Sequence, residues 1–313
     1  MQPIGDIDEH DEDAPSKHQA ARRSTLVSVV VNIFLTVTQV FTGIVSGSQG
    51  LIADGIHSLS DLVADFVVLF ANHHSQKAPD DDHHYGHQRY ENAASLTLGT
   101  LLLAVGVGML WSAFRKIEQP ASIQQVRIIA LWVALGSLMA KELLFRYMLG
   151  VGQRVRSSML IANAWHARSD AAASLVVAVG IGGNLLGYTM LDPLAAMIVG
   201  FMVTKMGWGF AWDALHDLMD RAVDEKTITG ISQTLKDTPG VLGWHDLKTR
   251  KMGDLILVDV HLEVDAGMSV EQGHDIALDA RRRVMEQHPV LNLMTHVDPA
   301  RPADYPNRAG VKI

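Results

Sequence analysis

The stretches Asp54-Gly-Ile-His57-Ser-Leu-Ser-Asp61 and His166-Ala-Arg-Ser-Asp170 both contain the pattern His-x-x-x-Asp. Residues four apart share one face of a helix, so each pattern presents an imidazole nitrogen and a carboxylate together. Two such faces that meet supply an N2O2 ligand set, which suits the tetrahedral geometry that zinc prefers. Both patterns lie in segments hydrophobic enough to cross a membrane, where ionisable residues are costly enough to indicate a function.

The composition predicts a membrane protein with a soluble C-terminal part. The chain has 313 residues, of which 48% are hydrophobic and 19% are charged, against roughly 25% charged residues in an average globular protein. The apolar residues are concentrated before about residue 212. A membrane span needs about 20 mostly apolar residues. Six segments are expected to be spans: 24–46, 51–71, 92–114, 126–148, 158–183 and 189–211.

Charged residues predict the topology and exclude one class of partner. The links 46–50 and 184–188 contain no Lys or Arg, whereas most Lys and Arg near the span ends fall on the opposite side, which places both termini in the cytoplasm. The net charge of −8 argues against a nucleic acid partner. No signal peptide or organelle presequence is apparent, so we expect a multi-pass protein of a cell inner membrane. Because the chain has no cysteine, metal binding must use His and carboxylate ligands.

The residues after position 212 predict a small α+β domain. The run 255–265 alternates between apolar residues such as Val258 and polar residues such as His261, which is typical of a strand with one buried face. Its helices are expected at 224–236 and 268–288 and its strands at 240–251, 254–265 and 290–298, in the order αββαβ. The expected domains are a polar tail (1–22), a six-helix membrane domain (23–212), the α+β domain (213–300) and a C-terminal tail (301–313).

Four motifs together resemble the cation diffusion facilitator family of metal-proton antiporters. They are the two His-x-x-x-Asp segments, the loop His84-Tyr-Gly-His87-Gln-Arg-Tyr-Glu91 and the segment Trp244-His-Asp-Leu-Lys-Thr-Arg250. The similarity covers residues from about 22 to 300. It implies six transmembrane helices, a ferredoxin-like cytoplasmic domain, a homodimer formed through that domain and the membrane region, and efflux of a divalent metal driven by protons. It implies no enzymatic activity.

The resemblance also implies three groups of metal ligands and one charge interlock. Zn2+ is the expected ion, both as the transported substrate and as a structural or regulatory ion of the cytoplasmic domain. The implied residues are the transport site His57, Asp61, His166 and Asp170; the loop site Asp80, His83 and His87; the cytoplasmic site His245, His261, His274, His296 and Asp298; and the dimer interlock Arg89 and Asp220.

Ligand chemistry suggests how such a site would work. Two ionised aspartates and two neutral histidines carry a charge of about −2 that a divalent cation neutralises, and protons compete for the same groups. Two imidazoles favour zinc over metals that prefer oxygen, although iron, cobalt, cadmium and manganese stay open as substrates. A membrane-anchored metal sensor or scaffold is an alternative function. A zinc hydrolase fits less well, because four protein ligands leave no open coordination position.

Overall fold

The computed structural model describes residues 14–301 except 121–122, 124 and 156–157. The chain divides into two compact units, which we describe separately. The first unit comprises Met1–Phe66 and Gly99–Trp208, and the second comprises Val67–Leu98 and Gly209–Ile313.

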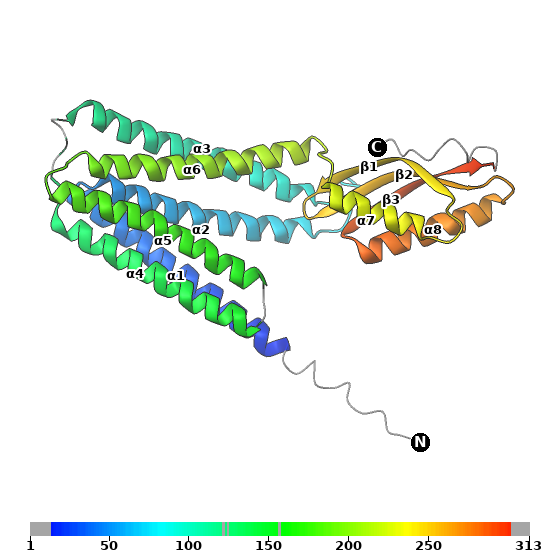
Figure 1. Ribbon diagram of the computed structural model, residues 1–313, viewed down its shortest axis with the longest axis horizontal. Helices are drawn as coiled ribbons and strands as arrows, with labels where there is room; N and C mark the ends of the chain where they lie inside the picture. Colours follow the sequence, from blue (N-terminus) through cyan, green and yellow to red (C-terminus); the bar gives the residue numbers. More distant parts are fainter. Residues whose placement is uncertain (1–13, 121–122, 124, 156–157, 302–313) are drawn as a thin grey trace, which may run out of the picture. The chain divides into compact units, whose positions relative to one another are not determined.

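Long helices account for most of the first unit (Figure 1). Helix α1 begins at Ala14, so residues 14–22, expected in a polar tail, are helical instead. This segment is rich in Ala, Gln, Lys and Arg, which are strong helix formers; residues 1–13 lie outside the described part. The six long helices of the described chain are α1 (Ala14–Ser46), α2 (Gln49–Ser75), α3 (Arg89–Glu118), α4 (Ile128–Val155), α5 (Ser158–Leu185) and α6 (Leu191–Leu218).

Four of these helices are long and apolar enough to cross a membrane. Within the described residues, the qualifying stretches are Leu26–Ser46, Arg89–Glu118, Ile128–Arg154 and Leu191–Leu218. The chain is therefore a helical membrane protein. Helices α2 and α5, expected as the second and fifth spans, are not among these four; they carry the His-x-x-x-Asp residues, together with Asp54 and Asp65 in α2.

Glycines allow α3 and α6 to approach closely inside the first unit. A Cβ atom added to Gly106 of α3 would lie 2.6 Å from the backbone nitrogen of Thr204 in α6, and one added to Gly207 of α6 would lie 2.6 Å from that of Leu103. Backbone atoms cannot move out of the way as a flexible side-chain end can. Between membrane helices there is no hydrophobic driving force, so the close packing that small residues allow stabilises their association.

We predict that Gly106→Ala lowers the stability of the first unit, because the added methyl group separates α3 from α6. Overpacking of this kind costs about 1–3 kcal/mol. Thermal unfolding of the detergent-solubilised protein measures the effect. Gly108→Ala is the matched control, since a Cβ atom at Gly108 would meet nothing within 4 Å. Equal melting temperatures for the two variants would contradict the packing role of Gly106.

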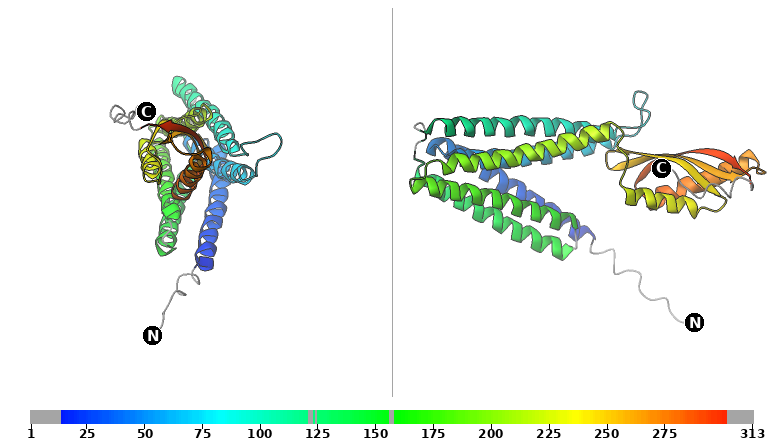
Figure 2. Two further views of the ribbon diagram at one scale, coloured as in Figure 1. Left: turned by 90° about the vertical axis from the view of Figure 1, so that its right-hand side faces the viewer. Right: turned by 45° about the horizontal axis from the view of Figure 1, so that its top comes forward.

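The α+β domain in the second unit has the expected αββαβ order. Strand β2 lies between its neighbours, antiparallel to β1 and parallel to β3. Helices α7 and α8 cover one face of the sheet (Figures 1 and 2), where Ile231, Val260 and Val284 belong to a common buried core. The elements are α7 (Glu225–Lys236), β1 (Gly243–Met252), β2 (Leu255–Asp265), α8 (Val270–Gln287) and β3 (Val290–Ala300).

Local signals explain the boundaries of these elements. Asp224 caps α7 by accepting a hydrogen bond from the backbone of Thr227, and Ser269 with Gln272 forms a reciprocal capping box at the start of α8. Val258, Val260 and Leu262 of β2 are buried, while the intervening residues point to the more open face. The alternation expected for this strand is confirmed, and it leaves the polar side of the sheet available for ligands.

The second unit also contains helix ends that were expected in the membrane domain. Asn92 near the start of α3 accepts a hydrogen bond from the backbone nitrogen of Gly253 (3.0 Å), in the turn between β1 and β2. Glu91 accepts hydrogen bonds from Asp254 (3.2 Å) and from Ser75 at the end of α2 (2.6 Å). These polar contacts attach the ends of α2 and α3 to the β1–β2 turn within the second unit.

Candidate metal centres

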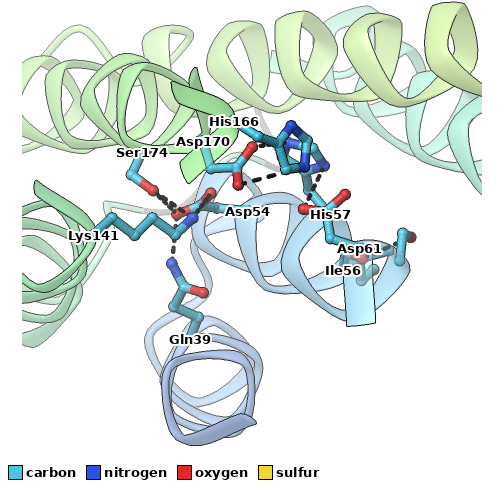
Figure 3. A network of polar contacts seen from close by, with 10 residues as sticks. Gln39, Asp54, Ile56, His57, Asp61, Lys141, His166, Asp170 and Ser174 are labelled. Carbon is cyan, nitrogen blue, oxygen red and sulfur yellow. Dashed lines mark hydrogen bonds and ion pairs between the residues drawn. The ribbon is translucent and has the colours of Figure 1, made fainter. Parts of the chain in front are cut away.

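Helices α2 and α5 bring two aspartates around one buried histidine. The Nδ1 atom of His57 lies 3.6 Å from the carboxylate of Asp61, and its Nε2 atom lies 3.8 Å from that of Asp170 (Figure 3). Asp61 follows His57 by four residues on the same helix face, whereas Asp170 comes from the other helix. Both ring nitrogens of His57 thus face carboxylates, and the two His-x-x-x-Asp patterns do meet.

The fourth expected ligand, His166, lies at the edge of this group. Its Nε2 atom is 3.9 Å from the carboxylate of Asp170, and its side chain is 53% exposed, against 6% for His57. One ligand atom from each of His57, Asp61 and Asp170 lies within 4.8 Å of the others, and His166 is not part of that tight group. We refer to His57, Asp61, Asp170 and His166 together as the intramembrane cluster.

The environment of His57 fits a metal ion. Its Nδ1 atom is buried and has no hydrogen-bond partner in the described structure. A buried polar atom without a partner is unfavourable by about 1–3 kcal/mol, so such an atom is expected to serve a purpose. A divalent cation among the imidazole and the two carboxylates would satisfy the nitrogen and neutralise the acidic charge.

The loop after α2 forms a second group with its own geometry, in the second unit. The carboxylate of Asp80 lies 3.1 Å from Nδ1 of His83 and 3.2 Å from Nε2 of His87. His87 is 8% exposed and its Nδ1 atom has no hydrogen-bond partner, whereas Asp80 and His83 are about half exposed. All three residues expected in the loop site are therefore brought together, on a far more open surface than the intramembrane cluster.

Strand register aligns three histidines across the sheet of the α+β domain. His245 of β1 pairs with His261 of β2, which in turn pairs with His296 of β3. The ring centroids of neighbouring histidines are 5.0 Å and 4.7 Å apart. Asp298 contacts all three rings, at 3.3 Å from His245, 2.9 Å from His261 and 3.3 Å from His296. We call these four residues the sheet cluster.

Two further residues refine the expected ligand set of the sheet. The carboxylate of Glu263 lies 3.1 Å from Nδ1 of His245, and Glu263 was not expected in the site. The signal for it was present, because Glu263 follows His261 by two residues and so lies on the same strand face. His274 is exposed on α8 and does not belong to the sheet group formed by His245, His261 and Asp298 among the described residues.

Arg89 and Asp220 form an ion pair within one chain. The guanidinium of Arg89 donates to the carboxylate of Asp220 at 2.5 Å and to the backbone oxygen of Leu218 at 3.1 Å. Arg250 of β1 approaches the other carboxylate oxygen of Asp220 at 3.8 Å. Asp220 has a positive φ of 60°, a left-handed conformation that Asp tolerates better than most residues. The contacts link the start of α3 and the end of β1 to the end of α6 and the residues just after it.

Comparison with known proteins matches almost the whole chain to one family. Residues 25–219 match the cation efflux transmembrane domain, and residues 223–300 match the cytoplasmic domain of cation efflux proteins. The chain belongs to the cation diffusion facilitator family. It is accordingly a metal cation efflux transporter, and the cytoplasmic domain that it shares with the family suggests a homodimer.

Proteins of similar sequence are found in plants and in bacteria, among other organisms. The chain is 34% identical over 289 residues to metal tolerance protein C1 of Arabidopsis thaliana, a match that covers 88% of this chain but only 61% of the plant protein. It is 32% identical to the manganese efflux system protein MneS of Bacillus subtilis, covering 88% and 94% of the two chains. It is also 33% identical to the magnetosome protein MamB of a Magnetospira strain, covering 82% and 87%.

The sheet cluster yields a prediction about pH. The hydrogen bond from His261 holds the pKa of Asp298 below its ordinary value, against the opposing effect of partial burial, and the charges of the three histidines act in the same direction as the hydrogen bond. A carboxylate with a lowered pKa stays ionised above its ordinary value of 3.8. Protons therefore compete with a metal ion at the imidazole nitrogens rather than at this carboxylate.

We expect zinc binding to the sheet cluster to weaken as the pH falls from about 7.5 to about 5.5, the range in which imidazoles gain protons. Asp298→Asn should lower the affinity about ten-fold or more at both pH values without removing the pH dependence. Titration calorimetry of full-length protein carrying Asp61→Ala and Asp170→Ala measures this. Loss of the pH dependence in the Asp298→Asn variant would show that Asp298 itself titrates in this range.

Proposed function

We propose that the protein exports Zn2+ from the cytoplasm in exchange for protons, with the intramembrane cluster as the transport site. The observation that carries the proposal is the burial of His57 between the carboxylates of Asp61 and Asp170, on two helices of a membrane protein. Histidines and aspartates exposed to water have little energetic cost. Burying them together among membrane helices is unfavourable unless a cation binds between them.

The proposal treats α2 and α5 as membrane spans, giving six spans in all. Both helices are long enough to cross a bilayer, at 27 and 28 residues. Their polar residues lower the mean hydropathy, and in an intramembrane binding site such residues face the interior of the bundle rather than lipid. An even number of spans is consistent with both termini in the cytoplasm, the orientation that the Lys and Arg distribution favours in a cell inner membrane.

The mechanism follows from the shared preference of metal and protons for the same atoms. The ionised carboxylates of Asp61 and Asp170 supply two negative charges, which a divalent ion balances. Zinc leaves when protons occupy the imidazole nitrogens and the carboxylates, so the two substrates alternate at one site. Alternating access requires two packings of the helices, one open to each side, whose populations shift with the bound substrate.

The donor set supports zinc as the substrate. Two imidazoles and two carboxylates suit zinc or cobalt better than manganese, which favours oxygen ligands. The name of the relative MneS records manganese efflux, so the proposal of zinc rests on the donor set and not on overall sequence similarity. The exposed position of His166 also matters for specificity, because the tight group without it contains one nitrogen and two oxygens from protein. Movement of His166 toward His57, Asp61 and Asp170 would complete the set of two nitrogen and two oxygen ligands that suits zinc.

The loop and sheet clusters support a regulatory role for zinc in the cytoplasm. Their histidines are largely more exposed than His57, so ions can exchange with solvent without helix movement. We propose that metal on the sheet cluster stabilises the cytoplasmic domains of a homodimer, since an ion that binds only the folded state stabilises it by mass action. The ion pair between Arg89 and Asp220 would support the same dimer next to the membrane.

We expect purified protein in proteoliposomes to carry zinc across the bilayer with opposite proton movement. The variant with Asp61→Ala and Asp170→Ala should lose transport by about 100-fold or more, because the remaining imidazoles cannot balance a buried dication. Fluorescent zinc and pH indicators inside the vesicles measure both fluxes. The matched control replaces the exposed acidic residues Asp81 and Asp82 by Ala and should transport normally. Zinc binding without any flux would instead support the sensor alternative.

The same assay tests the preferred metal. Zinc and cobalt should compete with each other more strongly than manganese does. His57→Asp changes the buried group to three carboxylates, so it should shift the preference toward manganese by about ten-fold or more. Preferred transport of manganese by the unaltered protein would refute zinc as the substrate while leaving metal efflux intact.

The absence of cysteine makes the topology directly testable. Single substitutions Gly187→Cys, in the short link after α5, and Gly267→Cys, in the turn after β2, introduce one thiol each into exposed positions. In intact cells a membrane-impermeant thiol reagent should label Gly187→Cys and spare Gly267→Cys, because the two positions are expected on opposite sides of the membrane. Labelling of both after the membrane is permeabilised is the control. The reverse pattern would invert the topology.

A further inference from the structure

A buried polar network lies beside the intramembrane cluster. Asp54 of α2 accepts hydrogen bonds from three other helices: from Gln39 of α1, from Lys141 of α4 at 3.2 Å, and from Ser174 of α5 at 2.7 Å. Lys141 also donates to Ser174 at 2.8 Å. Asp54, Gln39 and Ser174 are 0% exposed and Lys141 is 3% exposed. Both oxygens of one carboxylate thus connect four helices.

The network continues the two ligand faces by one helical turn. Asp54 precedes His57 by three residues on α2, and Ser174 follows Asp170 by four residues on α5, so each lies on the face that carries the ligands. Figure 3 shows Asp54, Lys141 and Ser174 next to Asp170 and His57. Lys141 thus reaches a carboxylate that lies one turn from His57 on the same face of α2.

The position of Lys141 is energetically unfavourable, which indicates that the residue has a function. It lies midway along the apolar stretch Ile128–Arg154 of α4. A charged side chain at the centre of a membrane helix is among the most unfavourable placements available, and such residues usually pair with one another in the interior. Replacing both members of a buried ion pair by apolar groups is often neutral or stabilising, so stability alone is a weak reason for keeping the pair.

Charge balance supplies a stronger reason. Asp61 and Asp170 contribute two negative charges, Asp54 adds a third, and Lys141 adds one positive charge. With Lys141 present, the region matches a divalent cation. Without it, the carboxylate of Asp54 would leave one additional negative charge a single turn from His57, and in a medium of low dielectric constant this charge would hold a metal ion more tightly.

We propose that Lys141 is a positioning residue for metal transport. It neutralises Asp54, so the site keeps only the two negative charges of Asp61 and Asp170. A divalent ion balances these charges and can still leave the site. The proposal rests on the proposed function of the intramembrane cluster. Through the contacts of Lys141 and Asp54 with Ser174, the same pair also holds α2 and α5 in register, so that the two ligand pairs face one another. Lys141 itself does not touch the metal.

The test compares the two single variants with the double variant in zinc-loaded proteoliposome transport. Lys141→Met should lower KM and kcat about ten-fold each, because the metal binds more tightly and leaves more slowly. Asp54→Asn should raise KM about ten-fold, because the unpaired ammonium repels the ion. The variant with both substitutions should return KM to within about three-fold of the unaltered protein, since the net charge is restored.

The neighbouring pair on α4 provides a matched control. Arg146 follows Lys141 by five residues, has a 72% exposed side chain and forms an ion pair with Glu142. Arg146→Met removes a positive charge from the same helix and should leave KM and kcat within about two-fold, since the carboxylate partner of Arg146 is Glu142 rather than Asp54. A purely structural role for Lys141 would lower the amount of folded protein in the single variants without moving KM in opposite directions.

The outcomes separate this proposal from the proposed function. Shifts of KM in the same direction for Lys141→Met and Asp54→Asn, or no recovery in the double variant, would overturn the charge-balancing role. Asp54→Asn is nearly isosteric and carries the test if Lys141→Met does not yield folded protein. If the unaltered protein shows no flux, the transport proposal fails by itself. In that case calorimetry measures zinc binding instead. Binding that is lost in the Asp61→Ala, Asp170→Ala variant belongs to the intramembrane cluster, and its affinity should shift in opposite directions in Lys141→Met and Asp54→Asn.

Discussion

Ionisable side chains in an apolar medium must be paired, and this constraint organises the first unit. His57, Asp61, Asp170, Asp54 and Lys141 all lie in or beside the interior of a helical membrane protein. The partners of the α2 residues come from α1, α4 and α5, so the polar contacts determine which helices approach α2 and at what height. The apolar residues fill the remaining space, but they do not specify these neighbours, because lipid is as apolar as the side chains themselves.

The three clusters use the same ligand types in very different environments. The side chain of His57 is 6% exposed, whereas those of His245, His261 and His296 are 38–67% exposed. Burial makes the charge balance of the intramembrane cluster strict, since water cannot compensate an extra charge there. At the sheet surface, water and the neighbouring Glu263 can adjust to the presence or absence of an ion. The same ligand types are therefore consistent with the two roles proposed for them, transport at the intramembrane cluster and regulation at the sheet cluster.

The polar face of the sheet illustrates how far sequence reasoning reaches. Alternation along residues 255–265 is sufficient to predict that His261 lies on the open face, and the strand is observed as expected. The pairing of His245, His261 and His296 in one row depends on register between strands, which a single sequence does not contain. His274 fits the family pattern in sequence, yet it lies on α8, outside the sheet group formed by the described residues.

The sequence by itself determined the helical and strand elements and the two His-x-x-x-Asp faces, because each of these is encoded in residue spacing over a few turns or alternations, and its four motifs carried the resemblance to the family. Only the tertiary structure decided that His166 lies at the edge of its cluster and that Lys141 pairs with Asp54 and Ser174. Lys141 lies 87 residues from Asp54. Such contacts depend on how α2, α4 and α5 rotate and pack, and helical periodicity describes each helix alone without fixing its partner or its rotation.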